Sequence, residues 1–115
     1  MSASSDSPVR NVRWEDRYAV VQAAGDINTE RVPAFLQSLL AVLDEKPDRI
    51  VVNLQDVGYM DSAGLASLVK VLSRARKGGM ELHLACMGEM IRGLFEITRL
   101  DSVFQIHESE QEALA

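Results

Sequence analysis

The chain alternates between strand-like and helix-like patterns from residue 9 onward, and this alternation restricts its fold more than any other feature. Two short apolar segments at 9–14 and 18–24, joined by a polar turn, predict a β-hairpin. Apolar residues then recur every three or four positions from Val32 to Leu43, which predicts an amphipathic helix capped by Asn28 or Thr29. The remaining predictions are strands at 49–54, 80–86 and 103–107, helices at 61–77 and 87–94, and a short acidic helix or tail at 108–115.

This order of elements predicts an α/β fold with one small mixed β-sheet of four to five strands. Strands that are linked through a helix pair in parallel with right-handed crossovers, so the helices collect on one face when the strand order does not reverse. The strand at 49–54 supports this arrangement, because Ile50, Val52 and Leu54 form one apolar face while the other face is mixed. We therefore expect the helices to lie mainly on one face of the sheet.

Length and composition fit a single ordinary domain. The 115 residues leave room for one domain, which we place at residues 9–115, after a polar N-terminal tail at 1–8 that is predicted to be disordered. The chain has 17 acidic and 12 basic residues and a net charge of −5, and acidic proteins are repelled by phosphate backbones, which argues against nucleic-acid binding. The basic cluster of Arg74, Arg76 and Lys77 falls where a helix is predicted to end, and the helix dipole explains it.

Several features favour a cytoplasmic location and a role other than catalysis. No apolar run approaches the roughly 18 residues that a membrane span needs, and the start of the chain lacks the apolar segment of a secretory signal. The single cysteine, Cys86, excludes an internal disulfide and fits a reducing compartment. No cluster of His and Cys has metal-ligand spacing, and no glycine-rich loop of the phosphate-binding type is present. We therefore expect no metal, cofactor or catalytic residue, and we interpret His83 and His107 as ordinary strand residues.

Three segments follow the predicted parallel strands, at 25–29, 55–62 and 86–89, and should meet at one edge of the sheet, where open α/β folds place their binding sites. Asp61 has a structural explanation as the N-cap of the next helix. Gly64 is unfavourable in a first helical turn by about 1 kcal/mol, which indicates that something approaches the backbone there. Tyr59 and Met60 either contact a partner from an exposed loop or fold back onto the core.

The middle segment resembles a known family motif. Residues 57–65, VGYMDSAGL, resemble the signature loop of the STAS domain, the domain named for sulfate transporters and anti-sigma factor antagonists. The segments GDIN at 25–28 and LFEITRLD at 94–101 resemble two further motifs of this family. The resemblance extends over about residues 9–114 with every element in the family's order, which makes it far more specific than the short Asp-Ser-x-Gly motif alone.

The resemblance implies a function in signalling. Stand-alone STAS domains of this size are anti-sigma factor antagonists: they bind an anti-sigma factor that is also a serine kinase, and so release a sigma factor. The kinase phosphorylates the motif serine, which dissociates the complex, and a PP2C-type phosphatase reverses the modification. Carried over to this sequence, the phosphorylation site is Ser62, and the partner-binding residues are Asp26, Asn28, Asp56, Tyr59, Met60, Asp61, Ala63, Gly64 and Met87.

Two positions depart from the family pattern. Asn28 stands where many members have aspartate, a change that would weaken contact with the kinase or slow phosphorylation. Ala63 stands where the best-known members have serine or threonine, which leaves Ser62 as the one acceptor in the motif.

Two other classes of function are the alternatives to this one. A hydrolase is disfavoured, because Ser62 lacks the G-x-S-x-G surroundings of an activated nucleophile and the sequence places no histidine beside it. The stronger competitor is a STAS regulatory or scaffold subunit of a membrane transporter or a stress-signalling complex. Neighbouring genes discriminate: an anti-sigma factor, a sigma factor or a PP2C phosphatase supports the antagonist, and an ABC-transporter operon supports the competitor.

Overall fold

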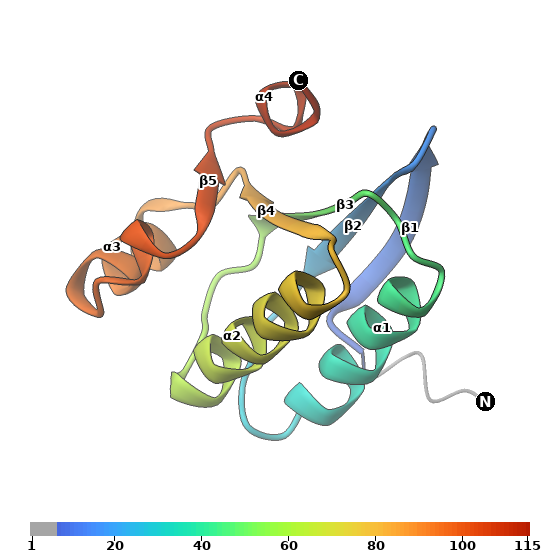
Figure 1. Cartoon of the computed structure of the whole chain (residues 1–115). Helices are drawn as coiled ribbons and strands as arrows, with labels where there is room; N and C mark the ends of the chain where they lie inside the picture. Colours follow the sequence, from blue (N-terminus) through green and yellow to red (C-terminus); the bar gives the residue numbers. More distant parts are fainter. Residues whose placement is uncertain (1–6) are drawn as a thin grey trace.

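A five-stranded mixed sheet forms the centre of the structure, a computed structural model that describes residues 7–115 (Figure 1). The strands lie in their sequence order, with β1 antiparallel to β2 and the other neighbours parallel. Their bounds are β1 Val9–Glu15, β2 Tyr18–Ala24, β3 Arg49–Asp56, β4 Glu81–Ala85 and β5 Gln105–His107. The predicted hairpin and parallel strands are therefore confirmed.

The helices follow the predicted order. They are α1 Val32–Asp44, α2 Ser62–Lys77, α3 Glu89–Ile97 and α4 Glu110–Leu114, with a short 3-10 turn, η2, at Leu100–Ser102. The helix α1 begins later than predicted, because Asn28 first closes a turn. The Asn28 side chain accepts a hydrogen bond from the Arg31 N–H, and its carbonyl accepts from Arg31 and Val32. Pro33 then falls in the first helical turn, where its missing N–H leaves no bond unmade.

The main core lies between one face of the sheet and the first three helices. Ile50, Val52 and Leu54 of β3 point into this core, as the alternation predicts, and α1, α2 and α3 bury their apolar sides in it. Figure 1 shows α1 and α2 side by side on one face of the sheet and α4 on the other. A smaller apolar cluster, which includes Val51 and Ala113, joins α4 to that second face. The prediction that the helices lie mainly on one face of the sheet is therefore confirmed, and α4 is the exception.

Of the predicted N-terminal tail at 1–8, residues 1–6 lie outside the described residues and residues 7 and 8 are described. Pro8 is described and buried, and its carbonyl accepts a hydrogen bond of 2.7 Å from the Ala24 N–H at the end of β2. Pro8, which the sequence assigns to the tail, is therefore packed against the sheet.

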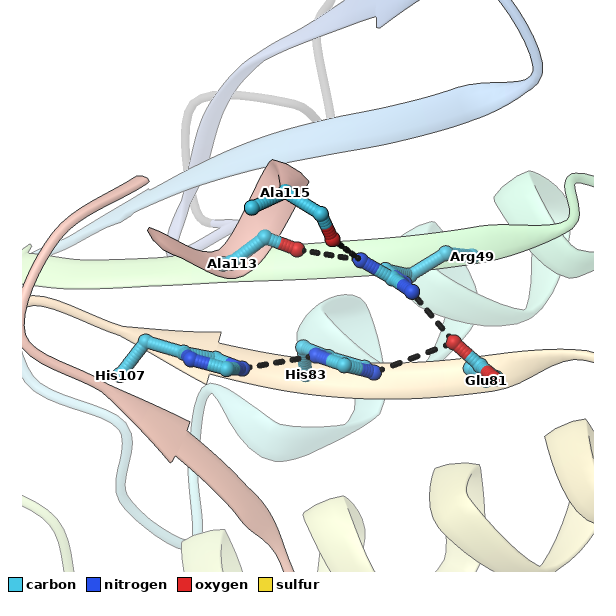
Figure 2. A network of polar contacts seen from close by, with 6 residues as sticks. All are labelled: Arg49, Glu81, His83, His107, Ala113 and Ala115. Carbon is cyan, nitrogen blue, oxygen red and sulfur yellow. Dashed lines mark hydrogen bonds and ion pairs between the residues drawn. The ribbon is translucent and has the colours of Figure 1, made fainter. Parts of the chain in front are cut away.

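A row of polar contacts ties the last strand and the C-terminus to the sheet (Figure 2). The His83 Nδ1 lies 2.8 Å from the His107 Nε2, and the Glu81 carboxylate accepts a hydrogen bond from the His83 Nε2 at 3.2 Å. Arg49 pairs with Glu81 at 2.8 Å and also donates to the Ala113 carbonyl at 2.6 Å. The Glu81 carboxylate can only accept a hydrogen bond, so the neutral His83 carries its proton on Nε2 and accepts at Nδ1. The His107 Nε2–H is therefore the donor between the two rings.

This row makes the stability of the protein depend on pH. The pKa of His83 is held below its ordinary value, first because burial disfavours the imidazolium and then because Arg49 is positive. As the pH falls below about 6.5, His83 becomes protonated in the unfolded chain before it does in the folded chain. The contribution of His83 to stability is therefore complete above that pH and is lost as the pH falls below it. We expect the melting temperature to fall between about pH 7.5 and about pH 5.5, and to fall less in His83→Gln. An equal fall in both proteins would contradict this assignment.

Candidate functional site

The loops that follow β2 and β3 are joined backbone to backbone at one edge of the sheet. Ile27 and Met60 form an isolated parallel bridge, in which the Ile27 N–H donates to the Tyr59 carbonyl at 3.0 Å and the Asp61 N–H donates to the Ile27 carbonyl at 3.3 Å. The Gly25 N–H also donates to the Asp56 carbonyl at 3.0 Å. Segments 25–29 and 55–62 therefore meet as predicted, and both lie next to the start of α2.

Asp61 fixes the geometry of this edge. One carboxylate oxygen accepts the Gly64 N–H at 3.0 Å, which makes Asp61 the N-cap of α2, as predicted. The other oxygen accepts both the N–H and the hydroxyl of Thr29, at 2.9 and 3.1 Å. These hydrogen bonds, the Gly64 bond foremost, lower the pKa of Asp61. The carboxylate therefore remains charged at neutral pH and ties the β2–α1 loop to the N-terminus of α2.

Ser62 is the first residue of α2, and its side chain is exposed. Within residues 7–115 its hydroxyl has no hydrogen-bond partner, in contrast to the neighbouring Asp61 and to Thr29. The prediction of an exposed serine in the first turn of this helix is confirmed. An unpaired hydroxyl at an exposed helix start is sterically open to an enzyme that modifies it.

The other exposed members of the predicted site carry acidic or aromatic side chains. Asp26 and Asp56 are exposed, and Asp56 pairs with Arg10 at 2.8 Å. Tyr59 is 46% exposed, so it lies on the surface and not in the core. Asn28 and Ala63 are half-buried.

Three residues of the predicted partner-binding set are buried: Met60, Gly64 and Met87. Met60 is only 4% exposed and Met87 only 7%, because both side chains pack into the main core. Gly64 is buried as well, and what approaches its backbone is this same chain. A Cβ at this position would lie 2.6 Å from the Ile27 carbonyl oxygen and 2.6 Å from the Met60 Cγ. These residues shape the site from beneath and do not form its surface.

Gly64→Ala tests the close packing directly. We expect a loss of about 1–3 kcal/mol in the free energy of unfolding, because the Ile27 oxygen belongs to the backbone and cannot swing aside. The matched control is Gly93→Ala in α3, where no atom lies within 4 Å of the added Cβ and alanine should stabilise the helix by up to about 1 kcal/mol. Urea unfolding measures both changes, and a stabilising Gly64→Ala would contradict the described contact.

Thr29 belongs to the site, whereas the sequence predicts only a possible role as a helix cap for it. Its two bonds to Asp61 span 32 residues of sequence, so no local pattern indicates them. The sequence indicates this role of Thr29 only indirectly. A small hydroxyl residue directly follows the GDIN segment, at the edge of the sheet where the loops are expected to meet.

Among residues 7–115, no group of three or more His, Cys, Asp or Glu side chains is arranged to hold a metal ion. Across that same part of the chain, no helix has the length and apolar character needed to cross a membrane.

Comparison with known proteins agrees with this geometry. The family model of the STAS domain matches residues 10–113. The chain belongs to the STAS-domain family. This STAS protein is 30% identical over 97 residues to the anti-sigma-B factor antagonist of Staphylococcus aureus, covering 84% of this chain and 90% of that protein.

Solved structures show the same fold. The crystal structure of an anti-sigma factor antagonist from Mycobacterium paratuberculosis is 27% identical, with a TM-score of 0.79 and coverage of 90% of this chain and 88% of that one. The Bacillus cell fate determinant SpoIIAA in its phosphorylated form is 16% identical, with a TM-score of 0.70 and coverage of 90% and 95%.

Proposed function

We propose that this STAS protein is an anti-sigma factor antagonist that binds an anti-sigma factor serine kinase and is switched off by phosphorylation of Ser62. The observation that carries the proposal is the free, exposed hydroxyl of Ser62 at the start of α2, beside the N-cap Asp61. The names of the S. aureus and Mycobacterium relatives support the same class of function. The chain acts through binding in the cytoplasm, and its partner supplies ATP and the catalytic groups.

The effect of a phosphate follows from the occupied cap. A helix N-terminus tolerates anions, so the fold survives the modification. The Gly64 N–H, however, already donates a hydrogen bond to Asp61. A phosphate on Ser62 therefore does not bind that N–H and stays at the surface. Phosphorylation adds about −1.5 to −2 charges beside a carboxylate whose lowered pKa keeps it ionised. The repulsion therefore acts on whatever docks at this edge.

The surface for the kinase is formed by the exposed and half-buried members of the site: Asp26, Asn28, Asp56, Tyr59, Asp61, Ser62 and Ala63. The anti-sigma factor covers this edge while Ser62 is unmodified. A PP2C-type phosphatase removes the phosphate and restores the binding form.

The proposal is tested by titrating the unmodified chain into a preformed complex of sigma factor and anti-sigma factor kinase from the same organism, without ATP. We expect the chain to bind the kinase and free the sigma factor. Ser62→Ala should do the same and should continue after ATP is added, because no phosphate can be placed on it. If neither protein binds any anti-sigma factor and the gene lies in a transporter operon, the regulatory-subunit alternative replaces this function.

A further inference from the structure

Helix α2 carries an unusual distribution of charge. Its 16 residues include Lys70, Arg74, Arg76 and Lys77 but no acidic residue. The chain as a whole has 17 acidic and 12 basic residues and a net charge of −5. Exposed helices ordinarily gain from mixing charges of both signs at spacings of three and four residues. Because α2 has no acidic residue, its cations form no stabilising ion pairs with other side chains of the same helix.

None of these four cations pairs with a carboxylate within residues 7–115, and three of them make no polar side-chain contact there. Ion pairs with carboxylates involve five other arginines: Arg10, Arg13, Arg17, Arg49 and Arg92. The Arg76 guanidinium donates to the Val103 carbonyl. Within residues 7–115, the side chains of Lys70, Arg74 and Lys77 are exposed and have neither an ion pair nor a hydrogen bond. They form a positive patch that the protein itself does not neutralise.

The positive patch lies farther along α2 than Ser62 and is partly rotated from it around the helix axis. Spacings of four and three residues align Lys70, Arg74 and Lys77, and Ser62 lies eight residues, or about two turns, before Lys70. Between them are the exposed Ala66 and Val69, and Val69 is 40% exposed. A shallow hollow on the exposed surface of α2 is lined by Ala66, Val69, Lys70, Ser73, Arg74 and Lys77. Helix α2 therefore begins beside the ionised Asp61 and becomes apolar and then basic on its exposed surface toward its C-terminal end.

The helix dipole accounts for only part of this pattern. Cations in the last turn of a helix are favoured by about 0.3–1 kcal/mol each, and this applies to Arg74 and Lys77. Lys70 lies before the last turn, where the dipole effect has faded. The dipole also gives no reason for leaving Val69 uncovered at the centre of the same helix.

We propose that the anti-sigma factor lies along α2 as well as on the loop edge, and that it presents carboxylates to Lys70, Arg74 and Lys77. The inference rests on the proposed function and names the chemistry of the partner surface. The acidic N-cap Asp61 at the start of α2 and the positive patch toward its end favour one docking direction, because the reversed orientation would put like charges together. Phosphorylation of Ser62 then adds negative charge at one end only.

The size of the patch favours an acidic protein over a phosphate polymer or a membrane. Three cations along seven residues of helix span about 10 Å, which matches a short row of carboxylates. The net charge of −5 opposes the approach of the whole molecule to nucleic acid or an anionic lipid surface. A partner that covers only the α2 side escapes most of this repulsion.

The test is a charge reversal with a matched control. Lys70→Glu combined with Arg74→Glu removes the patch, and Lys46→Glu combined with Arg99→Glu reverses two other exposed cations that have no ion pair within residues 7–115. Binding to the anti-sigma factor kinase encoded nearest this gene is measured at about 50 and about 300 mM salt. We expect the α2 double variant to bind about tenfold or more weakly at low salt, with a smaller difference at high salt. The control should stay within about twofold of the unchanged protein.

The outcomes separate the inference from the function on which it rests. If the unchanged protein binds no anti-sigma factor, the proposed function fails. If it binds and the α2 variant binds equally well at both salt concentrations, only the inference fails. Carbodiimide cross-linking, which joins lysines to carboxylates, should link Lys70 or Lys77 to an acidic residue of the kinase. Loss of binding to phosphatidylserine vesicles or duplex DNA, with kinase binding intact, would assign the patch to that surface and overturn the inference.

Discussion

Leu68→Ala is expected to lower the free energy of unfolding by about 2–5 kcal/mol, while Ser62→Ala leaves it almost unchanged. Leu68 is 0% exposed and lies in the main core on the inner side of α2. Removing its side chain leaves a cavity beneath the helix that carries the site. Ser62 makes no hydrogen bond within residues 7–115, and the cap of α2 is Asp61.

Urea unfolding of both variants measures the contrast. A domain of this size has a total stability of about 5–15 kcal/mol, so the Leu68→Ala change removes a large share of it. The two variants lie six positions apart on the same helix, which makes each a control for the other. A loss in Ser62→Ala comparable to that in Leu68→Ala would show that the serine is structural and would remove the main support for a switch.

A phosphate on Ser62 should weaken binding to the anti-sigma factor by about 30-fold to several-thousand-fold. The estimate follows from a cost of about 2–5 kcal/mol for a buried charge without a partner at an interface. Ser62→Asp should reproduce part of this loss, because it adds one charge where a phosphate adds about 1.5 to 2. Ser62→Ala should bind like the unchanged protein.

The control for this prediction is Ser102→Asp. Ser102 is an exposed serine in η2, which precedes β5 and therefore lies toward the opposite edge of the parallel strands. The same added charge at this position should change the affinity by less than about twofold. Isothermal titration or interferometry at one salt concentration compares the variants, and equal losses at both serines would point to a general charge effect.

Much of the fold is predictable because its signals are local. The strand at 18–24 and the end of α2 at Lys77 match the structure as predicted, since turn residues and a period of three to four residues mark them. The cap by Asp61 is also predictable, because a cap and its N–H donor lie three residues apart. These features require no knowledge of which strands are neighbours.

The buried members of the site could not be predicted in the same way. Met60 looks like a surface loop residue by sequence, and its burial depends on the bridge with Ile27, which brings together two distant segments. The contact between His83 and His107 spans 24 residues and requires the register in which His83 lies beside Gln105. The sequence indicates a close approach to the backbone at Gly64, but only the fold shows that Ile27 and Met60 fill the space.

The most direct test of the switch is to incubate the protein with its anti-sigma factor kinase and ATP, locate the modification by mass spectrometry, and titrate the purified product against the same kinase. We expect one added phosphate, on Ser62, and the loss of affinity given above. We expect no modification of Ser62→Ala, even though Thr29 lies in the same site. A phosphate located on Thr29 or any other residue, or an unchanged affinity after stoichiometric phosphorylation of Ser62, would contradict it.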